Sequence, residues 1–180
     1  MRADDPLLTS RGQRHPEPLR VVLSRSLDLP DQAQLWDQTV ATTLVAHGLI
    51  EAVCSEDDSA KQDQQRGSVL ERLQQHGVDV QQLVRCEPDS LMKHLGSLGC
   101  NQVLWECGPS LAAVALRQGC VQELAVVIAP KLMGGSLACT PLGDLGFTAM
   151  DQVLPLTLAA AQQLGPDLLL QAQLMPERIG

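Results

Sequence analysis

Short apolar runs alternate along this chain with segments in which apolar residues recur at helical spacing. Runs rich in aliphatic and β-branched residues predict strands. There are seven such strands if the run at Val78 is a strand, and six if it is a turn. Helical spacing predicts helices near Val69–His76, Pro88–Leu98 and Leu111–Gln118, with glycines after them as stops. The expected strands are Leu19–Leu23, Ala41–Ala46, Val78–Val84, Gln102–Glu106, Glu123–Pro130, Leu154–Ala161 and Leu168–Leu174.

This alternation is typical of an α/β fold, with parallel strands, helices on both faces and an antiparallel pair at the C-terminus. A short helical turn is expected within Asp31–Thr39. The polar, Gln-rich stretch Ser55–Gly67 is predicted to be a mobile surface loop. We find no internal repeats, and the 180 residues suit a single domain.

The composition is that of a globular protein, with 44% hydrophobic and 19% charged residues. It excludes a disordered chain, a collagen-like fibre and a coiled coil. No apolar run approaches the roughly 18 residues of a membrane-spanning helix. The start of the sequence, Met1–Pro6, has no signal-peptide pattern, so we expect a cytoplasmic protein without a membrane partner.

Charge and aromatic content argue against nucleic-acid binding. The net charge is −8, and Trp36, Trp105 and Phe147 are the only aromatic residues. The charge is uneven, because residues 1–25 carry a net +2 and the remaining 155 residues carry −10. This N-terminal segment either holds a small anionic ligand or is a solvated basic loop.

No metal site is predicted. The six cysteines, the four histidines and their spacings match no zinc pattern, so reduced, half-buried cysteines are expected. Cys107 lies in a turn of interest, but the local sequence offers it no basic partner that would make it a nucleophile.

The most informative segment is Val103–Ala113, where an apolar run ends at Glu106, passes through Cys107-Gly108-Pro109-Ser110 and enters a helix of small residues. Glycine lets a ligand approach the backbone, and proline suits the first helical turn. Free N–H groups at such a helix start bind phosphate. A plain structural connection remains equally open. Glu106 is a candidate hydrogen-bond acceptor for a polar ligand, and the alternative is that it is an N-cap or a surface carboxylate.

Several segments in the same order resemble the reductase domain of the bifunctional riboflavin-biosynthesis deaminase–reductases of RibD type. The resemblance covers nearly the whole chain and implies a three-layer, dihydrofolate-reductase-like α/β/α fold. It also implies NADPH-dependent reduction of the ribosyl group of 5-amino-6-(5-phosphoribosylamino)uracil to a ribityl group. The matching segments are Ala3–Arg11, Pro18–Leu23, Leu29-Pro30, Leu104–Ala112, Leu116–Gly119, Val121–Leu124, Ile128–Gly135 and Leu164–Leu170.

The resemblance also implies site residues. Substrate contacts fall on Leu8, Arg11 and Glu106, with Arg11 suited to the substrate phosphate. Cofactor contacts fall on Asp4, Arg25, Ser26, Gly108, Pro109, Ser110, Leu111 and Ala112. No catalytic acid or base is assigned. A homodimer through the C-terminal strands is expected.

The chain departs from the family at its start, because about fifty residues normally precede the Asp-Asp-Pro motif. The family's zinc deaminase motifs are missing as well. We therefore expect residues 1–180 to be a single reductase domain shortened at its N-terminus, with open sheet edges. Two alternatives stay open, namely a non-catalytic relative that serves as a dimerisation module and a reductase of another pterin or pyrimidine.

Overall fold

A computed structural model describes residues 4–49, 56–132, 134–135 and 140–174, with side chains in 56–63 excepted. The chain divides into two compact units, Met1–Leu91 and Met92–Gly180.

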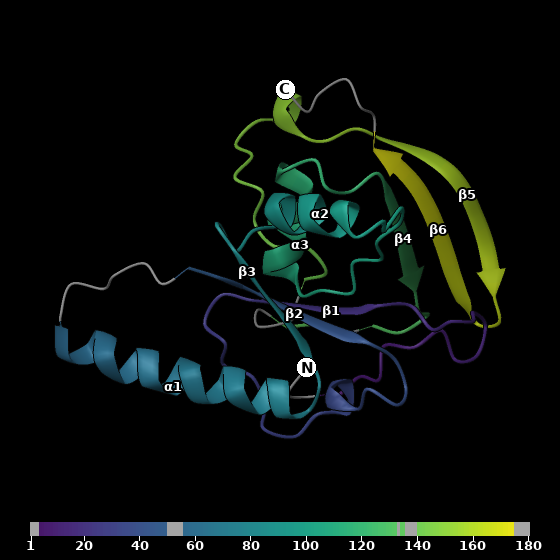
Figure 1. The fold of residues 1–180 in the computed structure, drawn as a ribbon. Coiled ribbons are helices and arrows are strands. Elements are labelled where there is room, and N and C mark those ends of the chain that lie inside the picture. The colour runs from purple at the N-terminus through teal and green to yellow at the C-terminus, as the bar shows by residue number, and fades with distance from the viewer. Residues whose placement is uncertain (1–3, 50–55, 133, 136–139, 175–180) are drawn as a thin grey trace. The chain divides into compact units, whose positions relative to one another are not determined.

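The first unit is built on a parallel sheet of strand order β1-β2-β3 (Figure 1). These strands are β1 (Arg20–Ser24), β2 (Thr43–Gly48) and β3 (Asp79–Leu83). All six residues of the central strand β2 are buried, which fits its apolar, β-branched start. Because the strands are parallel, their carboxyl ends meet at one edge of the sheet.

Helix α1 (Glu56–Gln75) and the short 3-10 helix η1 (Gln34–Trp36) cover this sheet. Val69 and Leu73 of α1 pack in one core cluster with Val45 of the sheet and Trp36 of η1. The helical periodicity seen in the sequence around residue 70 is thus the face of α1 that lies on the core.

The prediction of a mobile loop over Ser55–Gly67 was wrong, because α1 already begins at Glu56. Glutamine, glutamate, lysine, arginine and alanine all favour helix, whatever their polarity. Once Val69 and Leu73 anchor the helix, a polar stretch before them extends it at little cost. The polar composition of this stretch indicates that it is exposed to solvent, but it does not argue against a helix.

The second unit contains α3 (Pro109–Arg117), β4 (Glu123–Ile128), η2 (Met150–Gln152), β5 (Leu156–Leu164) and β6 (Asp167–Leu174). Helix α2 (Pro88–Ser97) crosses the division between the units. The strands form an antiparallel sheet of order β4-β6-β5 (Figure 1). The predicted α/β class and C-terminal hairpin are confirmed.

The strand expected at Gln102–Glu106 is not formed. A strand exists only where a neighbour completes its hydrogen-bond ladder, and no described segment pairs with these residues. Leu104 is 78% exposed, whereas Trp105 is half-buried and its Nε1 donates to the Cys120 carbonyl at 3.3 Å. The segment therefore runs as unpaired chain toward α3.

Among the described residues, no helix combines the length and apolar character needed to cross a membrane.

Candidate functional site

The N-terminal segment presents three of the predicted ligand residues from a fixed backbone. Asp5 Oδ1 accepts from the Gln34 N–H at 3.0 Å, and Gln34 Nε2 donates back to the Asp5 carbonyl at 2.7 Å. Leu8 packs half-buried on the core cluster, while Asp4 and Arg11 are exposed. Positive φ angles at Leu8 (47°) and Arg11 (51°) are disfavoured for side-chain-bearing residues. Surrounding contacts must hold both residues there.

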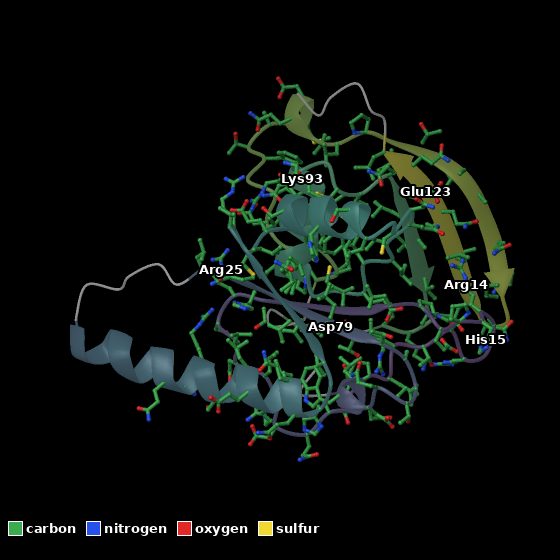
Figure 2. All side chains as sticks on the ribbon, viewed as in Figure 1. Arg14, His15, Arg25, Asp79, Lys93 and Glu123 are labelled. Carbon is green, nitrogen blue, oxygen red and sulfur yellow. The ribbon has the colours of Figure 1, made fainter. Side chains whose placement is uncertain are left out.

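Glu17 organises the loop around Arg11, a role that the sequence did not suggest. Its carboxylate accepts the backbone N–H of Ser10 at 2.7 Å and that of Gly12 at 3.3 Å. These hydrogen bonds, led by that from Ser10, lower the pKa of the Glu17 carboxyl. The single ionised carboxylate of Glu17 thus binds the backbone on both sides of Arg11 and closes the loop. Figure 2 shows Arg14 and His15 farther along the same loop.

Arg20 belongs to the core of the first unit and does not contribute to a basic surface. The residue is 2% exposed, and burial lowers the pKa of its guanidinium. This cation joins the N-terminal segment, η1 and the start of β2, so it is unavailable to a ligand. Its guanidinium donates to four backbone carbonyls, those of Leu7, Gln34, Asp37 and Ala41.

A tight turn after β1 presents the predicted cofactor residues Arg25 and Ser26. Ser24 Oγ accepts the Leu27 N–H at 3.1 Å, and Ser26 Oγ accepts the Asp28 N–H at 3.3 Å. Leu27 anchors the turn, because it is 2% exposed despite a φ of 57°. Arg25 and Ser26 stay exposed, and Arg25 can be followed in Figure 2.

Arg66 of α1 joins the carboxyl ends of two neighbouring strands. Its Nη1 donates to the Arg25 carbonyl after β1, and its Nη2 donates to the Gly48 carbonyl at the end of β2, both at 3.1 Å. His47 Nδ1 lies 3.0 Å from the same Gly48 oxygen. Sequence reasoning missed Arg66. Its position three residues before Val69 would have placed it on the core-facing side of a longer helix.

A cavity of about 290 Å³ opens between the turn after β1 and α1. Ligands in open α/β sheets bind outside the carboxyl ends of the strands, and this cavity lies at that edge. The volume suits a small group such as a phosphate or part of a sugar. The lining residues are Ser26, Leu27, Asp28, Gln65, Arg66 and Val69.

Cys86, after β3, packs against this edge. A Cβ on Gly48 would lie 2.9 Å from the Cys86 Cβ, so only glycine lets these two chain ends approach so closely. Burial raises the pKa of the Cys86 thiol, and the charges of Arg25 and Arg66 offset this in part. The thiol is therefore protonated at neutral pH and serves as a packing group.

In the second unit, the turn 106–110 leads into α3 as the sequence predicts. Gly108 is the N-cap residue and Pro109 the first residue of the helix, and no side chain of a described residue caps this end. The first N–H groups of a helix lack intrahelical partners and, with the helix dipole, attract anions. Gly108, Pro109 and Ser110 are exposed, while Leu111 and Ala112 are half-buried.

Gly143 supports this turn from another part of the chain. Its N–H donates to the Pro109 carbonyl at 3.0 Å. A Cβ at Gly143 would lie 3.0 Å from the same oxygen, so a side chain would force the two segments apart. Residue 143 thus fixes the first turn of α3, which the sequence did not indicate.

Glu106 is exposed just before this turn, where its carboxylate can accept hydrogen bonds from a ligand. Cys107 is half-buried, and burial raises the pKa of its thiol. A protonated thiol is a poor nucleophile, which agrees with the expectation that Cys107 is a small packing residue. Cysteines 86, 100, 107 and 120 form no disulfide within the part of the chain that the structure describes.

The structure places the predicted residues in both units. The first unit holds Asp4, Leu8, Arg11, Arg25 and Ser26, and the second holds Glu106 and the turn 108–112. No group of metal ligands occurs among the residues that the structure describes.

Comparison with known proteins gives consistent results. Riboflavin biosynthesis protein RibD of Synechocystis sp. is 47% identical over 167 residues, which are 93% of this chain and 42% of that protein. The chloroplastic riboflavin biosynthesis protein PYRR of Arabidopsis thaliana is 37% identical over 98% of this chain and 27% of its own length. This chain thus spans less than half of these relatives.

The α/β fold of this chain is similar to that of a solved RibD structure. The form 2 structure of Acinetobacter baumannii RibD superposes with a TM-score of 0.74 at 24% identity, covering 96% of this chain and 44% of that one. Residues 1–170 match the family described as the RibD C-terminal domain. The chain belongs to this family.

Proposed function

We propose that this chain is an NADPH-dependent reductase of riboflavin biosynthesis. In this proposal it reduces the ribosyl group of 5-amino-6-(5-phosphoribosylamino)uracil to a ribityl group. The observation that carries the proposal is the family match over residues 1–170, which includes every predicted site residue. The alternatives of a non-catalytic dimerisation module and of another pterin or pyrimidine reductase are not favoured by a 47% identical relative named for riboflavin biosynthesis.

The turn before α3 fits a dinucleotide phosphate. Gly108 has a φ of −71°, which any residue can adopt, and no heavy atom of the described residues lies within 4 Å of the place where its Cβ would be. Neither backbone conformation nor packing therefore requires glycine here. A ligand that approaches the backbone closely does require it, and the N–H groups of Ser110 and Leu111 suit its phosphate oxygens.

Cofactor contacts in the first unit are proposed for Asp4, Arg25 and Ser26. The exposed turn that holds Arg25 and Ser26 borders the cavity at the carboxyl edge of the parallel sheet. An arginine and a serine hydroxyl both suit a nucleotide phosphate.

Substrate contacts are proposed for Leu8, Arg11 and Glu106. Arg11 offers a planar, multiple-donor cation to the substrate phosphate, and the Glu17 carboxylate holds the loop that carries it. Leu8 would pack against the pyrimidine from a fixed backbone. Glu106 would accept hydrogen bonds from the polar groups of the substrate.

The reaction needs placement more than acid–base chemistry. NADPH, when bound, supplies a hydride to C1′ of the open-chain imine form of the substrate, and the imine nitrogen takes a proton from water. The residues named above orient the imine, hold its phosphate and exclude alternative poses. No side chain is required as a general base.

We also propose a homodimer through the C-terminal strands. Adjacent residues Val126, Val127 and Ile128 of β4 are 43–60% exposed, and β5 carries further exposed leucines. Successive strand residues point to opposite faces, so Val127 lies on one face of the sheet and Val126 and Ile128 lie on the other. Exposed apolar side chains on a sheet are typical of an association surface. A cytoplasmic location and a single reductase domain over residues 1–180 belong to the same proposal.

A thermal titration of the purified chain tests cofactor use. Bound NADPH should raise the unfolding free energy by about 2.7 kcal/mol at a hundredfold excess over its dissociation constant. A cooperatively melting protein that shows no shift with NADPH or NADH would refute the proposal for this chain.

A further inference from the structure

Arg11 lies in a tight turn that does not favour arginine. The Gln13 N–H donates to the Ser10 carbonyl at 3.1 Å and closes a four-residue turn. Both central residues have positive φ angles, 51° at Arg11 and 77° at Gly12. Two successive positive φ angles are those of a type I′ turn, which prefers Asn, Asp or Gly at the first position. An arginine at that position has to be held by contacts from outside the turn.

Glu17 supplies such contacts from five to seven residues farther along the chain. Its Oε2 accepts the Ser10 N–H at 2.7 Å, and its Oε1 accepts the Gly12 N–H at 3.3 Å. One carboxylate thus uses both oxygens on the two residues that flank Arg11. Hydrogen bonds from peptide N–H groups to an ionised carboxylate are stronger than those between neutral groups. Glu17 is therefore a firm clamp on the backbone of the turn.

Ser10 extends the same network toward the end of the loop. Its Oγ accepts the Arg14 N–H at 3.0 Å, in addition to the contacts of its backbone with Glu17 and Gln13. The backbone on both sides of Arg11 is fixed in this way, while the Arg11 side chain is exposed. The arginine is thus presented to solvent from a rigid base.

A rigid base matters for the phosphate contact proposed for Arg11. A guanidinium binds phosphate through a planar fork of N–H donors, so the contact depends on direction as well as on charge. A long side chain on a loose loop loses more conformational freedom when it binds, and this loss lowers the affinity. Holding the backbone before the ligand arrives reduces that loss.

The charge of Glu17 works against a phosphate ligand. Like charges repel, so a carboxylate beside Arg11 by itself lowers the affinity of the loop for an anion. On charge alone, a neutral residue at position 17 would therefore strengthen phosphate binding. A positioning role has the opposite effect, because the loss of the clamp weakens binding. The sign of the change distinguishes the two roles.

We propose that Glu17 is a positioning residue for substrate recognition, which holds the Ser10–Gln13 turn so that Arg11 meets the substrate phosphate from a fixed backbone. The inference rests on the proposed function. It assigns a role to a residue outside the set that the family resemblance implies.

The test measures kcat and KM for the substrate, at saturating NADPH, in the wild type, Glu17→Gln, Arg11→Ala and the double variant. Glutamine keeps the size of the side chain but turns one of its two acceptors into a donor, so one backbone hydrogen bond is lost. Glu17→Gln should raise KM about fivefold and leave kcat within about twofold. In the Arg11→Ala background the same substitution should change KM less than about twofold, because the guanidinium that it positions is absent.

Two further variants separate positioning from a general loosening of the first unit. Gly12→Ala strains the same turn through its φ of 77° without removing Glu17, and no heavy atom of the described residues lies within 4 Å of the new Cβ. It should raise KM as well. Asp37→Asn is the matched control, because the exposed Asp37 carboxylate also accepts a backbone N–H, that of Thr39 at 2.9 Å. It should leave KM unchanged.

Three results would overturn the positioning role. The first is a KM that falls or stays unchanged in Glu17→Gln. The second is an equal relative rise of KM with and without the Arg11 side chain, since Glu17 would then act independently of Arg11. The third is an effect of Asp37→Asn as large as that of Glu17→Gln, which would indicate general loosening.

The proposed function can fail separately from this inference. If the wild-type chain does not reduce the substrate, binding of ribose 5-phosphate is measured by NMR titration in the same four proteins. Weaker binding in Glu17→Gln, with no further loss in the Arg11→Ala background, would uphold the positioning role without the reductase. Binding that depends on neither residue, or no binding at all, would overturn it.

Discussion

Neither the backbone conformation of Gly108 nor the packing around it requires glycine, although glycine is a favoured N-cap residue. Its φ of −71° is ordinary and the space beside its Cα is open. Gly143, in contrast, is needed because a Cβ there would crowd the Pro109 oxygen. Gly143 is therefore explained by packing, whereas Gly108 leaves room for the proposed ligand.

Gly108→Ala is expected to leave the unfolding free energy within about 0.5 kcal/mol, because the gain in chain stiffness and the loss of a good N-cap nearly offset each other. NADPH affinity should fall at least about tenfold, because the methyl group occupies the place of the phosphate. Gly96→Ala is the control, since Gly96 also has open space around it but lies in α2. Unchanged affinity in Gly108→Ala would contradict the phosphate role of this turn.

Glu17 gives a pH dependence with a definite sign. Because the pKa of its carboxyl is lowered in the folded state, its contribution to stability is complete above the unfolded pKa of about 4.3 and is lost as pH falls through the folded pKa. Glu17→Gln should therefore be less stable than the wild type at pH 7 and converge with it in acid. Urea unfolding at both pH values measures this, and a constant difference between the two proteins would contradict it.

Two arginines show what residue-level sequence reasoning could not supply. In the sequence, Arg20 contributes to the charge of the basic N-terminal segment, but in the structure Arg20 is buried and donates to four backbone carbonyls. Arg66 lay in a stretch predicted to be a loop. A residue's hydrogen-bond partners depend on chain segments distant in sequence, so neither role follows from local pattern.

At the scale of elements, most strands and helices follow from local periodicity, and the two misses have physical causes. The turn into α3, the β5–β6 hairpin and the η1 segment lie where the sequence predicts them. α1 extends farther than its apolar pattern, because polar residues also favour helix. The Gln102–Glu106 run has strand-like residues, but a strand also needs a partner.

Hydrogen exchange distinguishes these cases. Amides of residues 102–106 should exchange much faster than those of β6, which has a ladder partner on each side. Amides of α1 between Arg66 and Gln75 should be protected as well. Equal protection of residues 102–106 and β6 would show that a ladder partner exists for the segment.

At the scale of the whole molecule, the net charge disfavours binding of polyanions, and the C-terminal sheet carries the exposed apolar residues of the proposed dimer. The net charge is −8. The residues proposed for the site fall in both units. Their assignment came from resemblance, since no spacing in the sequence joins residue 11 to residue 106.

The proposed dimer predicts that Val127→Glu lowers the mass measured by sedimentation velocity from two chains to one. Val127 is 60% exposed on β4, and a charge there cannot be buried without a partner. Leu132→Glu is the control, because Leu132 is fully exposed outside the sheet and should leave the mass unchanged. A wild-type chain that sediments as a monomer would refute the dimer.

The most direct test of the central claim is turnover. Purified chain is mixed with NADPH and 5-amino-6-(5-phosphoribosylamino)uracil, and the loss of reduced nicotinamide is measured together with the ribityl product. The account predicts one NADPH consumed for each ribityl product formed, and an increased KM in Arg11→Ala. A chain that binds NADPH but forms no ribityl product would contradict the claim that it is this reductase.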